Sequence, residues 1–127
     1  MMTPSIVPWL TVPVGSVAVE FYRNAFGAVE VFRMDDPGGG CVARLSISGA
    51  EFWVSGGPSA SEVLPVAPSD PPIRMILNVP NPDALFTQAI SAGATVQYPV
   101  QEAHGWRLGK IADPFGHHWE IGHPLTV

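Results

Sequence analysis

The sequence is poor in charged residues and has almost no cysteine. Charged residues make up 13% of the 127 residues, and only six are lysine or arginine. Because no basic patch is visible, we expect no nucleic-acid partner. Cys41 is the only cysteine. This excludes a disulfide within the chain and a zinc site built from several cysteines.

The chain also lacks long apolar runs. None approaches the ~20 residues that span a bilayer, and the first residues do not combine a basic start with an extended apolar stretch, as a signal peptide does. We therefore expect no membrane partner and a cytoplasmic location. The composition is that of one compact domain with a real core, since 46% of the residues are hydrophobic and the net charge is −5.

The first half of the chain predicts the order β-α-β-β-β. Residues 5–12 are short, apolar and rich in Val, Ile and Trp, which favours a strand despite Pro8. Residues 14–25 carry apolar side chains at helical spacing, and Gly27 is a suitable C-terminal stop. Three short strands are predicted after the helix, at residues 28–34, 41–47 and 50–55.

The second half predicts the same order after a linker. Residues 56–72 are dense in Gly, Pro and Ser, as in a linker that crosses the surface. A strand is predicted at residues 73–79. Asn81-Pro82-Asp83 then provides a capping residue, a proline at the first helical position and an acid in the first turn, and Gly93 ends the helix. The remaining strands are predicted at residues 94–100, 107–113 and 117–122.

The two halves have the features of a repeat. Val12-Pro13 and Val79-Pro80 are 67 residues apart, and Leu10 and Leu77 have the same separation, as do Gly49 and Gly116. We therefore predict an α+β fold with two tandem β-α-β-β-β modules in one domain, residues 1–127. Module 1 covers residues 1–55, the linker 56–72 and module 2 73–127.

The order of elements and two sequence stretches together resemble the vicinal oxygen chelate superfamily, which includes glyoxalase I, bleomycin-resistance proteins and extradiol dioxygenases. The stretches are EFYRNAFGA after the first strand and KIADPFGHHWEI at the end. AFGAVEVFRMDDPGGG is most similar to the PhnB-like branch. The resemblance implies a curved mixed sheet around a cup-shaped pocket, a small-molecule ligand and a homodimer.

The resemblance also implies four metal-ligand positions, on the first and last strands of the modules. The fourth corresponds to Glu120, and the 67-residue separation makes Trp53 its partner. Counting back from Phe21-Tyr22 gives Val7, and its partner is Arg74. Val7 has no donor atom, the Trp53 indole only donates, and Arg74 is a permanent cation. We therefore predict no metal site here and no cofactor, and leave a divalent metal as the alternative.

Two further interpretations concern Glu120. Arg74 and Glu120 could form a bidentate pair in place of the metal, or Arg74 could reach solvent while Glu120 bonds elsewhere. Strand alternation places His118 on the face of Glu120. The two residues could therefore act as a catalytic acid/base pair, and the alternative is that His118 only packs at the rim.

Other residues are candidates for contact with a ligand. Trp9 and Thr11 share the expected pocket face of the first strand, and Trp53 lies on the last strand of module 1. The alternative is that these tryptophans fill the core. In the stretch HGWRLG, residues 104–109, the candidates are His104, Trp106 and Arg107, and here the alternative is an exposed hairpin.

Three hypotheses for the function remain open from the sequence. The first is a metal-free protein that binds a small, aromatic compound. The second is a metal-independent lyase, isomerase or dioxygenase that uses Glu120 and His118, whereas metal-dependent glyoxalase I or extradiol dioxygenase activity is not expected. The third is a dimeric interaction module with a filled pocket.

Overall fold

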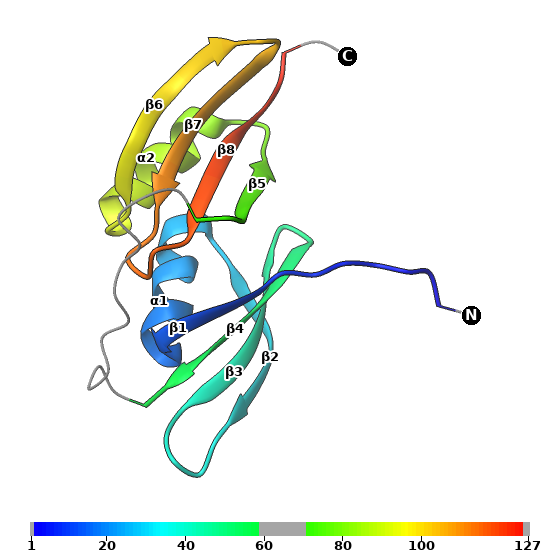
Figure 1. Ribbon diagram of the computed structural model, residues 1–127, viewed down its shortest axis with the longest axis vertical. Coiled ribbons are helices and arrows are strands. Elements are labelled where there is room, and N and C mark those ends of the chain that lie inside the picture. The colour runs from blue at the N-terminus through cyan, green and yellow to red at the C-terminus, as the bar shows by residue number, and fades with distance from the viewer. Residues whose placement is uncertain (1, 59–70, 126–127) are drawn as a thin grey trace. The chain divides into compact units, whose positions relative to one another are not determined.

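The computed structural model describes residues 2–58 and 71–125. Most of the predicted linker therefore lies outside the described residues. The chain divides into two compact units, each built on one βαβββ module (Figure 1). The elements of the first module are β1 (Trp9–Val14), α1 (Gly15–Phe26), β2 (Val29–Asp35), β3 (Cys41–Ile47) and β4 (Ala50–Gly57). Those of the second are β5 (Arg74–Asn78), α2 (Pro82–Ala92), β6 (Thr95–Ala103), β7 (Trp106–Ala112) and β8 (His118–Pro124).

Each module forms one four-stranded mixed sheet. The strand order is β1-β4-β3-β2 in the first and β5-β8-β7-β6 in the second. The first and last strands of each module pair in parallel, and the other pairs are antiparallel. The predicted fold class, α+β with two βαβββ modules, is confirmed.

The core of module 1 lies between α1 and one face of its sheet. Strand alternation buries side chains from three strands on this face, namely Leu10, Val12, Ala43, Leu45, Ile47, Phe52 and Val54. Tyr22 of α1 is fully buried and packs edge-on against Phe52, with the ring centroids 5.2 Å apart. The helix ends at Gly27, whose φ of 69° is the left-handed conformation that glycine adopts without strain.

Module 2 repeats this arrangement with a better-capped helix. The Asn81 side chain accepts a hydrogen bond from the Ala84 N–H, and Pro82 follows the cap as predicted. Phe86 and Ala89 are buried on the face of α2 that meets the sheet. Gly109 allows this close packing, because a Cβ there would lie 2.8 Å from the Phe86 ring.

The strand register supports the 67-residue repeat. Trp9 pairs with Trp53 in module 1, and the residues 67 positions later, Ile76 and Glu120, pair in module 2. Gly49 and Gly116 both precede the last strand of a module, with φ of 99° and 94°. The two halves therefore share turn conformation and pairing as well as element order.

The first strand begins later than the sequence suggested. Residues 5–8 were predicted to be part of it, but β1 starts at Trp9, and Val7 precedes it and is exposed. Pro8 has no N–H to give to a sheet ladder, although its carbonyl accepts from the Trp53 N–H at 2.8 Å. In consequence Trp9, and not Val7, is the first-strand residue that faces Trp53. In the part of the chain that the structure describes, neither helix is long and apolar enough to cross a membrane.

Candidate functional site

A row of side chains crosses the sheet of module 1 on the face opposite its core. Trp9 pairs with Trp53, Trp53 with Arg44, and Arg44 with Phe32, so each strand contributes one residue. The two indole rings stack, with centroids 5.3 Å apart and planes 12° apart. Phe32 meets Trp53 edge-on at 5.8 Å, and the Arg44 guanidinium lies 5.7 Å from the Trp53 centroid. We call these four residues the tryptophan platform.

The tryptophan platform is open to solvent within its module. Trp9 is 55% exposed and Phe32 is 44% exposed. The Trp9 indole N–H donates to the Ser55 hydroxyl at 2.9 Å, which fixes the ring orientation. Thr11 pairs with Ser55 in the next row. The predicted residues Trp9, Thr11 and Trp53 therefore share one face. Trp9 is not a core residue of module 1, because more than half of it is exposed.

Glu120 lies in a polar cluster in module 2. Its Oε2 accepts a hydrogen bond from Arg74 Nε, so the two residues pair, but through this one bond and not in the predicted bidentate geometry. The pair is not fully buried, because the Arg74 side chain is 54% exposed while that of Glu120 is 11% exposed. His118 is buried on the same face, and Lys110 lies directly opposite Glu120 in the β7–β8 pair. We call Arg74, Lys110, His118 and Glu120 the Glu120 cluster.

These residues do not fit a divalent metal. The strand partner of Glu120 is Ile76, and that of Arg74 is His118. Two of the four positions are Trp53 and Glu120, on the last strands. The other two, on the first strands, are Val7 and Arg74 by sequence, or Trp9 and Ile76 by strand pairing. In either case Glu120 is the one residue of the four that supplies a metal ligand. Two cations, Arg74 and Lys110, also flank it. No group of three or more His, Cys, Asp or Glu side chains suited to a metal occurs within residues 2–58 and 71–125.

We therefore expect the purified protein to hold well under one equivalent of tightly bound divalent metal. After incubation with Ni²⁺, Zn²⁺ or Mn²⁺ and dialysis, elemental analysis should give the same low ratio for the wild type and for Glu120→Ala. One equivalent per chain, lost in Glu120→Ala, would contradict the expectation. The physical reason is that one carboxylate beside two cations is a poor site for a third.

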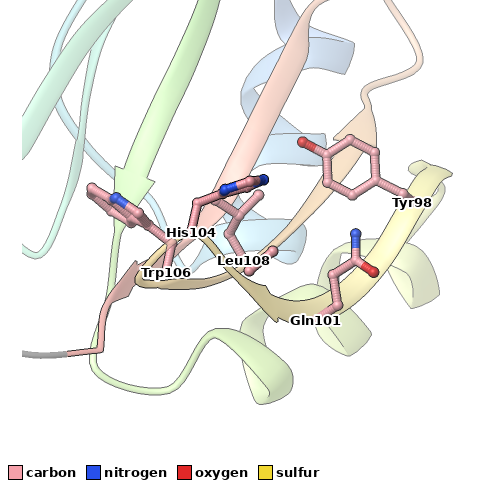
Figure 2. A pocket seen from close by; sticks show the side chains of 6 residues that line it. Tyr98, Gln101, His104, Trp106 and Leu108 are labelled. Carbon is pink, nitrogen blue, oxygen red and sulfur yellow. The ribbon is translucent and has the colours of Figure 1, made fainter.

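A pocket of about 270 Å³ lies at the β6–β7 hairpin, on the face of the module 2 sheet that also carries the Glu120 cluster. Its lining consists of Tyr98, Gln101, Ala103, His104, Trp106 and Leu108. Figure 2 shows the Tyr98 and His104 rings directed toward one another, with the Gln101 amide directed toward Tyr98. The pocket thus contains two of the predicted ligand residues, His104 and Trp106.

Arg107, the third candidate in this stretch, is engaged elsewhere. Its Nε and Nη2 donate to the two carboxylate oxygens of Asp83 at 2.8 and 2.5 Å, and its Nη1 donates to Glu102 at 3.3 Å. The bond from Arg107 lowers the pKa of Asp83 below its ordinary value, and the same bond raises the pKa of Arg107. Arg107 therefore joins the hairpin to the start of α2, and it is not among the residues that line the pocket.

The stretch DPFGHHWEI owes its conformation to Asp113. Asp113 Oδ1 accepts from the Phe115 and His117 N–H groups, each at 3.0 Å, and its Oδ2 accepts from the Trp119 indole N–H at 3.0 Å. Asp113 and Trp119 are both buried. The acid therefore shapes the turn that delivers His118 and Glu120 to the sheet, and it is a structural residue.

Sequence reasoning missed several residues of these sites. In module 1 these are Arg44 and Phe32, and in module 2 they are Lys110, Tyr98, Gln101 and Leu108. Alternation along β7 could have found Lys110 and Leu108, which share a face with Trp106. Tyr98 and Gln101 could not be placed this way, because the β6–β7 register shifts between them.

The described residues build two βαβββ modules, and neither sheet among them offers three or more side chains suited to a metal. The sequence matches the glyoxalase-like domain family over residues 11–122. The chain belongs to this family. An uncharacterized protein of Mycobacterium bovis is 37% identical over 131 residues, covering 96% of this chain and 84% of that protein. An uncharacterized protein of Mycobacterium tuberculosis is also 37% identical over 131 residues, covering 96% of this chain and 75% of that protein.

Solved structures show the same fold. A gene product of Arabidopsis thaliana is 26% identical, with a TM-score of 0.70 over 96% of this chain and 100% of that one. TioX from Micromonospora is 24% identical, with a TM-score of 0.71 over 97% and 100%. The fosfomycin resistance protein FosX of Listeria monocytogenes is 15% identical, with a TM-score of 0.74 over 98% and 95%. At identities below 25%, the last two support the fold alone.

Proposed function

We propose that the protein binds a small aromatic molecule without a metal, and that the molecule stacks on the tryptophan platform. The observation that carries the proposal is the stacked pair of Trp9 and Trp53, with Trp9 more than half exposed. A planar ligand could extend the stack from the exposed Trp9 ring. Phe32 and Met34, also exposed, would add apolar contact on the same face.

Energetics favour this use of the platform. A contiguous exposed apolar patch is a typical feature of a binding site, whereas single exposed apolar residues are common. Burial of such a patch by a ligand is worth about 25 cal/mol per Å². A well-placed aromatic pair adds about 0.5–1.5 kcal/mol beyond burial. The Trp9 ring is already oriented by its bond to Ser55 and by Trp53, so a ligand would meet a surface that needs little further ordering.

Titration with a panel of one- to three-ring aromatic compounds, followed by tryptophan fluorescence, tests the proposal. We expect at least one compound to quench the wild type saturably, and Trp9→Ala to weaken its binding about tenfold, since most of the stacking surface is lost. Val17→Ala is the matched control, because Val17 is an equally exposed apolar residue of the same module, on α1. A panel without any binder, or equal binding by Trp9→Ala, would refute the proposal.

A second candidate function is metal-independent acid/base catalysis by the Glu120 cluster. The specific observation is that His118 and Glu120 are both buried on one sheet face, with 5% and 9% of each whole residue exposed. Arg74 donates a hydrogen bond to one carboxylate oxygen of Glu120. Buried titratable groups on one face are a frequent feature of catalytic sites. The reaction would be a proton transfer of the lyase or isomerase kind, in which Glu120 Oε1 receives the proton.

We also propose that the chain belongs to the PhnB-like branch and forms a homodimer. The stretch AFGAVEVFRMDDPGGG supports the first proposal. The second is supported by the exposed apolar side chains Val29 and Val31 of the edge strand β2. Sedimentation analysis tests the dimer directly.

A further inference from the structure

The pocket of module 2 has a different chemistry from the tryptophan platform. All its residues come from β6, β7 and the turn between them. Ala103 and Leu108 provide apolar wall, while Tyr98, Gln101, His104 and Trp106 all carry groups that can hydrogen-bond. None of the six lining residues is Asp, Glu, Lys or Arg. The lining therefore offers ring surfaces and uncharged polar groups together.

The turn that carries His104 is conformationally costly. His104 has a φ of 54° and Gly105 a φ of 82°, and positive φ at both central residues is the pattern of a type I′ hairpin turn. Asn-Gly is the favoured pair for such a turn, and a residue other than glycine held in this region costs on the order of 1–3 kcal/mol. The Gly105 carbonyl accepts from the Leu125 N–H at 2.8 Å, which holds the turn in place.

Strain of this kind is concentrated at functional positions. The His104 ring is directed into the pocket in Figure 2, toward Tyr98. Asparagine would suit the turn better, but it is shorter than histidine and has no ring to place in the pocket. The Ser48-Gly49 turn has the same pair of positive φ values, 49° and 99°, so the turn conformation alone does not mark a site. The direction of the His104 ring into the pocket is the observation that does.

We propose that this pocket is a second ligand site, which binds an uncharged molecule with a single aromatic ring and hydrogen-bonding groups at its rim. Its volume equals the share of about nine waters in the liquid, which suits one substituted ring. Tyr98, Gln101 and His104 hydrogen-bond the rim, and Trp106 and Leu108 contact the ring. A carboxylate or ammonium is disfavoured, because no lining residue provides the opposite permanent charge.

The test uses 4-hydroxybenzamide, an uncharged single ring with a hydroxyl and an amide. The readout is the indole N–H resonance of Trp106 in the ¹⁵N-labelled full chain, assigned from its loss in Trp106→Phe. We expect a saturable shift in the wild type and about tenfold weaker binding in His104→Asn, the equivalent of one net hydrogen bond. His104→Asn should fold with an equal or higher melting temperature, since asparagine favours the turn.

Control variants lie outside both proposed sites. His123→Asn, which removes another imidazole outside the lining, should leave the titration unchanged, as should Val17→Ala at an exposed residue of α1. Gln101→Leu and Tyr98→Phe, which keep the size of each side chain, should each weaken binding and serve if His104→Asn folds poorly. The proposal would be overturned by the absence of a saturable shift, or by tighter binding of 4-hydroxybenzoate than of 4-hydroxybenzamide. It would also be overturned if His104→Asn, Gln101→Leu and Tyr98→Phe all bound the probe with the affinity of the wild type. Each of these results would leave the platform proposal standing.

Discussion

Asp113→Ala is expected to lower the free energy of unfolding by about 3–4 kcal/mol, because it leaves three donors without an acceptor. These are the N–H groups of Phe115 and His117 and the indole N–H of Trp119. The indole is the costliest of the three, since Trp119 is only 3% exposed. The loss is measured by urea unfolding followed by circular dichroism.

Asp113→Asn is the matched control for this prediction. One oxygen remains to accept from Phe115 and His117, but an amide nitrogen replaces the acceptor that faces Trp119. We therefore expect a smaller loss of stability, about 1–2 kcal/mol. Asp35→Ala, at an exposed acid whose partner is the nearby Arg33, should cost under ~1 kcal/mol. If Asp113→Ala were no worse than Asp35→Ala, the turn would be held by its backbone bonds alone.

The role of Asp113 shows what sequence could and could not provide. Strand alternation predicted that His118 and Glu120 lie on one face, and the β5–β8 register confirms this placement. The pattern could not show that an aspartate accepts three hydrogen bonds, because those partners are set by the conformation of the turn.

The platform and the pocket show a second limit, which is register. The helix ends followed from local chemistry at Asn81 and Gly27, and the order of the strands followed from the repeat. The ligand residues were harder to assign, because each row of side chains depends on the pairing of several strands. The start of β1 at Trp9 put Trp9 in the place expected for Val7, and the register shift in β6 brought Tyr98 and Gln101 into a pocket that alternation alone did not predict.

The Arg74–Glu120 pair is an instructive intermediate case. The sequence foresaw the contact, but the register places Arg74 beside His118 and not beside Glu120. The long guanidinium side chain reaches along the strand to make the bond. Because Arg74 is half exposed, solvent screens the pair and its net contribution to stability is small. The pair is therefore better understood as positioning Glu120 than as holding the module together.

Gly122→Ala is expected to destabilise the protein by about 1–3 kcal/mol and to weaken binding of 4-hydroxybenzamide at the same time. A Cβ on Gly122 would lie 2.5 Å from the Leu108 Cβ and 2.8 Å from its Cα, and it would also collide with the Arg107 carbonyl oxygen. Because backbone atoms are involved, β7 and β8 must separate to accommodate the methyl group.

The coupling of these two effects is what the structure specifically predicts. Gly122 pairs with Leu108, and Leu108 lines the pocket, so a shift of β7 changes the pocket wall directly. Gly38→Ala is the control, since nothing lies within 4 Å of a Cβ there; it should leave both unfolding and titration unchanged. A Gly122→Ala variant that lost stability but bound the probe as the wild type does would separate Leu108 from the ligand. If both properties fall together, the close approach of β7 and β8 is part of the site as well as part of the fold.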